Sequence, residues 1–347
     1  MHTAIENFIR WRIRQLAGLL CKIIPPRPGK QTVRKILCLI SGGLGDRLMA
    51  LPALRELKKQ YPQATMTVAW MHGSLDIVDQ EFHAVVNNAA CRIVQIFQIA
   101  LRNQDIVYVN IVGIFNVFSE LLVSLSRAPV RIGPAPHDSV YTKRIYTDIC
   151  DIKPGLHSTA INLAFTESGR FLSPVPYPVS VPKHRKRKKS IGIHPGVKTG
   201  YEMKQWPVGS FLSLARRLDS PDIEIVIIAG PDEPDTVGAL FAGHAFSVLI
   251  PHSITDLFTE IASLDLLIAN DSGPAHVAAA THTPVIVLFG PTDPQKVAPV
   301  FEKGEIITAG CECSPCFDTA NECKNSHRCM NEIQVEKVLK SVTRMVS

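Results

Sequence analysis

A strand-to-helix turn in the second half of the chain carries residues suited to bind a phosphate group. The sequence NDSGPAHVAAA follows an apolar run and continues into small residues. A strand that ends in Asp-Ser-Gly and opens a helix presents unpaired backbone N–H groups and a partial positive charge to an anion. We therefore predict a phosphate site that comprises Asp271, Ser272, Gly273 and His276. Taken alone, His276 is better explained as a buried structural histidine, and it is the neighbouring Asp271, Ser272 and Gly273 that favour the phosphate role.

A similar turn occurs in the first half, in the sequence ISGGLGDRL. It superficially matches a dinucleotide-binding fingerprint. However, the third spaced glycine is missing and the carboxylate of Asp46 would repel a pyrophosphate, so we reject a dinucleotide cofactor. Gly43 and Gly45 leave space for a bulky ligand, and Arg47 lies beside them. Asp46 at a helix start suits a general base that takes a proton from an attacking hydroxyl. The alternative is that Asp46 only caps the helix.

A third segment, HPGVKTG followed by KQWP, offers further groups for a diphosphate. Backbone N–H groups, a hydroxyl and flexible cations all bind phosphate oxygens. The candidates are Gly196, Lys198, Thr199 and Lys204. The alternative for the two lysines is an ordinary solvent-exposed position. Glu233 follows the next strand and is a candidate to hold ribose hydroxyls or, equally, to cap a helix.

The elements that must position these residues alternate between apolar runs and helical patterns, which is typical of doubly wound parallel sheets. We expect strands at 36–40, 66–70, 106–109, 191–194, 223–229, 266–269 and 285–289. We expect helices at 48–60, 114–126, 208–218, 256–263 and 333–345. A chain of 347 residues exceeds the usual size of one core, so two domains are expected. A proline-rich stretch that ends in KHRKRKK, residues 173–189, marks the boundary.

The composition limits the partners. A net charge of +6 suits an anionic partner, but aromatic residues make up only 7% and do not alternate with basic ones, so we do not expect nucleic acid. Residues 4–24 form an amphipathic basic pattern that predicts a helix lying on an anionic membrane or, equally, packed on the protein surface. Neither a signal peptide nor a membrane-spanning run is apparent, which favours the cytoplasm.

Nine cysteines divide into two groups. Four are scattered among apolar residues and are predicted to be buried thiols. The other five follow the pattern C-x-C-x2-C-x6-C-x5-C and comprise Cys311, Cys313, Cys316, Cys323 and Cys329. The spacing fits no standard zinc finger, so a structural cluster of thiols is favoured over a bound metal. We predict no catalytic metal, because no Asp-x-Asp turn is convincing.

Four motifs in this order resemble glycosyltransferase family 9, the ADP-heptose:lipopolysaccharide heptosyltransferases. They are SGGLGDRLMALPALRELKKQYP, HPG…KQWP, NDSGPAHVAAA…PVIVLFGPTDP and the cysteine-rich stretch that ends in CMNEI. The resemblance extends from about residue 35 to the C-terminus. It implies a GT-B fold, with two Rossmann-like α/β domains whose parallel sheets face across a cleft. The implied organisation is an N-terminal helix and linker (1–34), an acceptor domain (35–180), a nucleotide-sugar domain (190–330) and a last helix (331–347) packing back toward the first domain.

The resemblance also implies a chemistry. Asp46 matches the catalytic base of the family, Lys204 a lysine at the donor diphosphate, and Asp271 to His276 the donor-binding turn. The implied reaction is inverting transfer of heptose from ADP-L-glycero-D-manno-heptose to the lipopolysaccharide inner core, without a cofactor, by a peripheral protein at the cytoplasmic face of the inner membrane. The alternatives are transfer from another nucleotide sugar, a nucleotide-sugar epimerase of the same fold, and a non-catalytic membrane scaffold.

Overall fold

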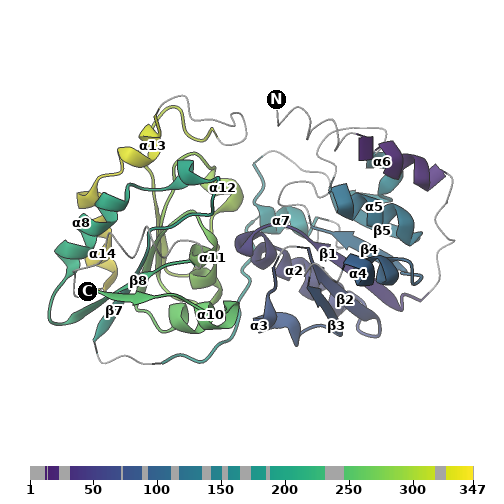
Figure 1. Cartoon of the computed structure of the whole chain (residues 1–347), viewed down its shortest axis with the longest axis horizontal. Helices are drawn as coiled ribbons and strands as arrows, with labels where there is room; N and C mark the ends of the chain where they lie inside the picture. The colour runs from purple at the N-terminus through teal and green to yellow at the C-terminus, as the bar shows by residue number, and fades with distance from the viewer. Residues whose placement is uncertain are drawn as a thin grey trace. The chain divides into compact units, whose positions relative to one another are not determined.

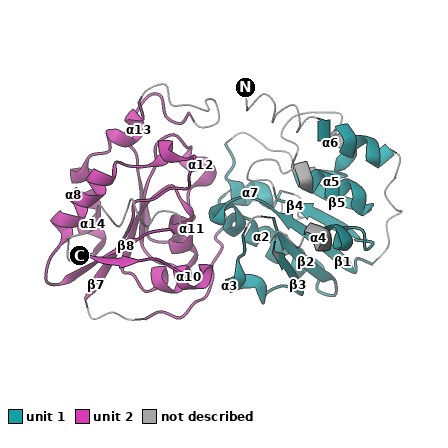
Figure 2. Cartoon of the chain, viewed as in Figure 1, with its two compact units in different colours: residues 1–175 teal, residues 176–347 magenta. Residues whose placement is uncertain are grey.

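The structure is a computed structural model (Figure 1). It describes residues 12–13, 15–22, 32–71, 73–87, 93–110, 117–134, 142–150, 155–164, 173–184, 188–230, 246–316 and 326–346. The chain forms two compact units, Met1–Val175 and Pro176–Ser347 (Figure 2). The division falls inside the proline-rich stretch that the sequence marks as a boundary.

Unit 1 contains one parallel sheet in the order β3-β2-β1-β4-β5-β6. Its strands are β1 (Lys35–Ile40), β2 (Thr65–Trp70), β3 (Ala84–Asn87), β4 (Ile106–Val109), β5 (Val130–Pro134) and β6 (Asp148–Cys150). Its helices are α2 (Leu44–Gln60), α3 (Asp76–Asp79), α4 (Ile93–Ala100), α5 (Val117–Ser126), α6 (Thr142–Ile145) and α7 (Ser158–Asn162). Strand β1 pairs with β2 on one side and β4 on the other, so the chain leaves β1 at a point where the strand order reverses. Ligands bind at such points in open α/β sheets.

Unit 2 repeats this plan with the order β12-β11-β10-β7-β8-β9, again parallel. Its strands are β7 (Lys189–His194), β8 (Ile223–Ile228), β9 (Ser247–Leu249), β10 (Leu266–Asn270), β11 (Val285–Leu288) and β12 (Gly304–Ile307). Its helices are η1 (Glu202–Lys204, 3-10), α8 (Val208–Leu218), α10 (Ile254–Ala262), α11 (Gly273–Ala280), α12 (Pro294–Val297), α13 (Arg328–Asn331) and α14 (Val335–Val346). Figure 1 shows α8 and α14 on one face of this sheet and α10 and α11 on the other. The two doubly wound sheets confirm the predicted fold class.

The core of unit 2 includes its last helix. Val338 and Val342 of α14 are fully buried in one apolar cluster with Phe211 and Leu214 of α8. These valines are four residues apart and therefore share one face of the helix. Helix α14 packs mainly against α8, β10 and β11 of its own unit. Packing of this helix toward the first unit stays a prediction.

The N-terminal helix lies partly outside the described residues, but 12–13 and 15–22 are helical. Ala17 and Cys21 are buried, whereas Leu16 and Leu19 are about half exposed, at 49% and 50%. The helix therefore presents a second apolar face that the rest of the described chain does not cover. In the part of the chain that the structure describes, no helix has both the length and the apolar character needed to cross a membrane.

Candidate functional site

The predicted anion turn of unit 2 lies between β10 and α11. All five residues of β10 are buried, and α11 packs its alanines into the core, so the turn is fixed at both ends. Ser272 is the N-cap of α11, but its hydroxyl makes no capping hydrogen bond and is buried without a partner. A buried hydroxyl without a partner is unfavourable. A ligand that enters the turn could therefore gain a hydrogen bond with the hydroxyl of Ser272. Pro274 has no N–H and the N–H of Ala275 donates to the carbonyl of Ser272 at 3.2 Å, so among the first three positions of α11 only Gly273 can offer its N–H to a ligand.

A partly buried ion pair lies beside this turn. The Nζ of Lys204 lies 2.7 Å from Oδ2 of Asp271, and the side chains are only 15% and 7% exposed. The hydroxyl of Thr292 donates to the same oxygen at 2.7 Å. The carboxylate is thus neutralised, so a nearby diphosphate does not face an uncompensated negative charge. Lys204 and Asp271 are brought together as a pair, which the sequence did not indicate.

Thr292 is a residue that the sequence analysis missed. It follows β11, which pairs in parallel with β10. The carboxyl ends of neighbouring parallel strands meet at one edge, and Asp271 follows β10 at that edge. The sequence did contain a signal for this residue. Thr292 is a polar residue that follows an apolar strand and the turn Gly290-Pro291.

Asn270 holds the loops around the ion pair. It is fully buried. Its Oδ1 accepts from the backbone N–H of Trp206 at 2.9 Å, and its Nδ2 donates to the carbonyls of Pro195 and Gly196 at 3.0 and 3.3 Å. One side chain therefore ties the exit of β10 to the loop after β7 and to the start of α8. Gly196 contributes to the site through this carbonyl.

The remaining loop candidates are more exposed. Lys198 and Thr199 are both on the surface. The ammonium groups of Lys198 and Lys204 lie 5.9 and 5.5 Å from the centre of the Tyr201 ring. Such distances suit cation–π contacts, so Tyr201 holds two cations near one another. Glu233 lies outside the described residues.

His276 is buried and bonded within unit 2. Its Nδ1 lies 2.7 Å from the hydroxyl of Tyr177, and the two rings stack at 6.1 Å with an angle of 25°. Tyr177 is fully buried, and burial raises its pKa above the ordinary value. Tyr177 comes from the segment at the unit boundary and was not among the predicted residues. The histidine is both structurally satisfied and close to the anion turn.

In unit 1, the glycine turn holds the carboxylate of Asp46 against the backbone. The N–H of Gly43 donates to Asp46 Oδ2 at 2.7 Å, with Gly43 as the N-cap of α2 and Asp46 at its third position. The helix begins four residues before the predicted start at 48, because Gly43 caps it. Asp46 therefore helps to cap α2, as the alternative interpretation of the sequence predicted. A catalytic role of Asp46 would come in addition to this capping role.

Arg47 bonds to the backbone. It is 7% exposed, its Nε donates to the carbonyl of Gly43 at 3.3 Å, and its Nη1 donates to the carbonyl of Ser74. Burial lowers its pKa. The guanidinium thus fastens the turn to the loop after β2. Of the other predicted residues, Gly43 is exposed and Gly45 half-buried.

Asn110, at the end of β4, was also missed. Its Oδ1 accepts from the N–H of Ser41 at 2.7 Å, and its Nδ2 donates to the carbonyl of Ser41 at 2.9 Å. The hydroxyl of Ser41 is buried without a partner, as is that of Ser272 in unit 2. Each unit therefore braces its turn with a buried asparagine and leaves one serine hydroxyl unpaired.

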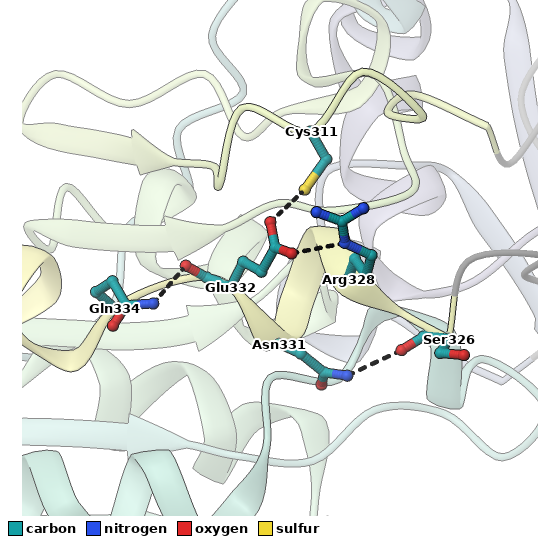
Figure 3. A network of polar contacts seen from close by, with 6 residues as sticks. All are labelled: Cys311, Ser326, Arg328, Asn331, Glu332 and Gln334. Carbon is teal, nitrogen blue, oxygen red and sulfur yellow. Dashed lines mark hydrogen bonds and ion pairs between the residues drawn. The ribbon is translucent and has the colours of Figure 1, made fainter.

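The cysteine segment lies against the turn before Thr292. The hydroxyl of Ser314 donates to the carbonyl of Gly290, and the N–H of Cys316 to that of Pro291 at 2.8 Å. Cys311 donates to Glu332 at 3.3 Å, and Glu332 also accepts from Arg328 at 2.6 Å (Figure 3). Partial burial and the neighbouring carboxylate raise the pKa of Cys311.

The other cysteines of the cluster differ in burial. Cys313 and Cys316 are half-buried, Cys329 is buried, and Cys323 lies outside the described residues. None of the described members is disulfide-bonded. Within the described ranges, no three Cys, His, Asp or Glu side chains are grouped so that they could hold a metal ion.

Solved structures share this architecture. The structure of the ADP-heptose lipopolysaccharide heptosyltransferase II of E. coli matches with a TM-score of 0.67 at 19% identity, over 90% of this chain and 98% of that one. The two parallel α/β units therefore have the GT-B fold.

Comparison of the sequence with known proteins gives a more specific assignment than the fold. The model described as glycosyltransferase family 9 (heptosyltransferase) matches residues 159–327. Lipopolysaccharide heptosyltransferase 3 of Escherichia coli is 26% identical over 282 residues, which is 72% of this chain and 81% of the relative. Lipooligosaccharide heptosyltransferase 2 of Campylobacter jejuni is 26% identical over 169 residues, which is 47% of this chain and about half, 52%, of the relative. Residues 159–327 thus match glycosyltransferase family 9, and relatives that span more of the chain carry heptosyltransferase names.

Proposed function

We propose that the protein transfers heptose from ADP-L-glycero-D-manno-heptose to the inner core of lipopolysaccharide, with inversion at the anomeric carbon. The observation that carries the proposal is the Lys204–Asp271–Thr292 cluster beside the N-terminus of α11, where a partly buried cation lies next to a helix start that can offer the N–H of Gly273. The cluster lies inside the span that matches the family model. The names of the E. coli and Campylobacter relatives support the sugar and the acceptor.

The donor would be held by unit 2. Its diphosphate would contact the N–H groups of Ser272 and Gly273, the hydroxyl of Ser272, and the ammonium of Lys204. Gly196, Thr199, Lys198 and His276 would complete this site, and Glu233 would bind the ribose. As ADP leaves, negative charge grows on the diphosphate, and preorganised cations and N–H groups stabilise it. The proposal therefore includes neither a catalytic metal nor a cofactor.

The acceptor would be activated by unit 1. A hydroxyl of the acceptor sugar attacks the anomeric carbon, its proton moves to the carboxylate of Asp46, and the bond from the anomeric carbon to the diphosphate oxygen breaks. Gly43 and Gly45 would give the acceptor room beside Asp46, while Arg47 keeps the turn in place. The carboxylate is already oriented by the Gly43 N–H, which favours a defined geometry for proton transfer.

A direct test combines cells and purified protein. Core oligosaccharide from cells that lack the protein should be short of one heptose by mass spectrometry, and the purified protein should release ADP from ADP-heptose only when acceptor is present. Donor conversion without acceptor would indicate an epimerase instead. Unchanged core oligosaccharide together with loss of a protein complex would indicate a scaffold.

The protein would act at the cytoplasmic face of the inner membrane, docked through the N-terminal helix. Its described part exposes Leu16 and Leu19 together with the cations Arg12 and Lys22. Apolar side chains beside cations suit an anionic bilayer surface. Sedimentation with vesicles that contain anionic lipid should be strong for the wild type and lost for Leu16→Ser/Leu19→Ser. Equal sedimentation of both proteins would contradict this docking mode.

A further inference from the structure

We propose that Tyr177 is a positioning residue for the donor site, because its hydroxyl holds the imidazole of His276 in the form that carries its proton on Nε2. The proposal rests on the proposed function, in which His276 contacts the donor diphosphate. It adds a residue from the boundary segment that no motif of the sequence indicates.

The first step is the geometry of the pair. The hydroxyl of Tyr177 and Nδ1 of His276 are 2.7 Å apart, a short distance for an O–H donor and a ring nitrogen. The rings also stack, and a half-turn of the imidazole would exchange Nδ1 for a carbon atom and break the bond to Tyr177. Tyr177 is 1% exposed and His276 4% exposed, so water cannot readily replace either partner.

The second step is the direction of the hydrogen bond. Burial raises the pKa of Tyr177, so the phenol keeps its proton. The phenolic proton then needs an acceptor of its own, since a buried hydroxyl proton without one is unfavourable. Nδ1 of His276 is the acceptor at hand. An imidazole that accepts at Nδ1 carries its proton on Nε2, and it is neutral.

The third step is the anchoring of the pair to α11. His276 lies in the first half of α11, and the N–H of Val179 donates to the carbonyl of Ala280 at the end of that helix, at 2.8 Å. Residues 177–179 therefore run along α11 and are bonded to it at two points. With its proton on Nε2, His276 offers a diphosphate an N–H donor, whereas the other tautomer would offer a lone pair that repels it.

The test uses Tyr177→Phe, which removes the hydroxyl and keeps the ring. Tyr108→Phe is a matched control, because Tyr108 is also a fully buried tyrosine, with its hydroxyl 3.2 Å from Asn162 Oδ1 in unit 1. The probe is ADP, measured by titration calorimetry. Tyr177→Phe should bind ADP about three- to tenfold more weakly, as expected for one neutral hydrogen bond. Tyr108→Phe should bind as the wild type does.

A spectroscopic measurement distinguishes a specific effect of Tyr177 on His276 from a general destabilisation of the protein. Long-range ¹H–¹⁵N spectra of the imidazole, with His276 assigned from the signals missing in His276→Gln, should show Nε2–H in the wild type and a mixture of tautomers in Tyr177→Phe. In the His276→Gln background, Tyr177→Phe should not weaken ADP binding further. Additive effects would mean that the two residues act separately, and would overturn the proposal.

The outcomes that contradict the two proposals differ. Nδ1–H in the wild type, an unchanged tautomer in Tyr177→Phe, or equal effects of Tyr177→Phe and Tyr108→Phe would each overturn the positioning role alone. Wild-type ADP binding by His276→Gln would overturn the donor role of His276, and the positioning role with it.

Discussion

Gly42 and Asp46 approach so closely that a Cβ atom on Gly42 would lie 2.6 Å from Cγ of Asp46. Gly42 also has φ of +107°, a conformation that other residues rarely adopt. The carboxylate of Asp46 can fold back onto the Gly43 N–H only because this space is open. The glycine turn is thus shaped around the acidic side chain.

Gly42→Ala should therefore lower the free energy of unfolding by about 1–3 kcal/mol and displace Asp46. Gly43→Ala is the control, because its Cβ would meet only Asp46 Oδ2 at 3.7 Å and its φ is −72°. Chemical denaturation of both variants measures the difference. Equal stability of the two variants would contradict the steric argument.

Asp46→Asn separates the two roles of Asp46. The amide oxygen of asparagine can still accept from the Gly43 N–H, so stability should change by less than about 1 kcal/mol. Asparagine cannot take a proton, so transfer should fall on the order of 10²–10⁴-fold. Asp46→Ala should lose both cap and activity. Steady-state transfer assays and thermal melts test this prediction, and near-normal transfer by Asp46→Asn would exclude Asp46 as the base.

Lys204→Met removes the cation from a partly buried pair, so that Asp271 keeps the hydroxyl of Thr292 as its partner. Breaking such a pair from one side should cost about 3 kcal/mol of stability. Adding Asp271→Asn should restore most of that stability, but not ADP binding, because the ammonium is still missing. Denaturation and ADP titration are the measurements. Wild-type ADP affinity in Lys204→Met would remove the lysine from the donor site.

Asn270→Ala would leave the N–H of Trp206 and the carbonyl of Gly196 without their partner, whereas the carbonyl of Pro195 also accepts from Gln205. The loss should be about 2–4 kcal/mol, since each unsatisfied group contributes. Asn331→Ala is the control, because its exposed amide makes one bond, to the carbonyl of Ser326. Its unfolding free energy should shift by less than about 0.5 kcal/mol. A small effect of Asn270→Ala on urea unfolding would show that the loops hold without it.

Cys311 should react slowly with iodoacetamide, since its raised pKa keeps it a thiol at neutral pH. Glu332→Gln removes the neighbouring negative charge and should lower the pKa of Cys311, so that alkylation starts at a lower pH. Mass spectrometry of the peptide, sampled across a pH series, follows the reaction. Identical pH profiles in the two proteins would rule out control by Glu332.

The sequence predicted the elements better than the contacts within the site. Apolar runs such as 266–269 and 285–289 are buried parallel strands, since burial on both faces leaves a continuous apolar signal. Their exit turns were predicted because glycine and small polar residues mark strand ends. The start of α2 was predicted too late, because Gly43 gives no capping signal of the Ser, Thr or Asp kind.

The missed residues share one cause. Asn110, Asn270, Thr292 and Tyr177 act through partners that are distant in the chain. Strand order decides which turns become neighbours, and spacing along a single sequence does not reveal strand order. The pairing of Lys204 with Asp271 depends on β7 and β10 lying side by side. The roles proposed for these residues in binding and transfer stay predictions.

The placement of α14 bears on how unit 2 forms during synthesis. Val338 and Val342 belong to its core, although every residue proposed to touch the donor is translated earlier. A ribosome that has just made the phosphate turn has therefore produced a half-covered sheet, whose apolar face stays open to chaperones until residues 335–346 emerge. A nascent chain that is stalled before that point should be sensitive to proteases and prone to aggregation.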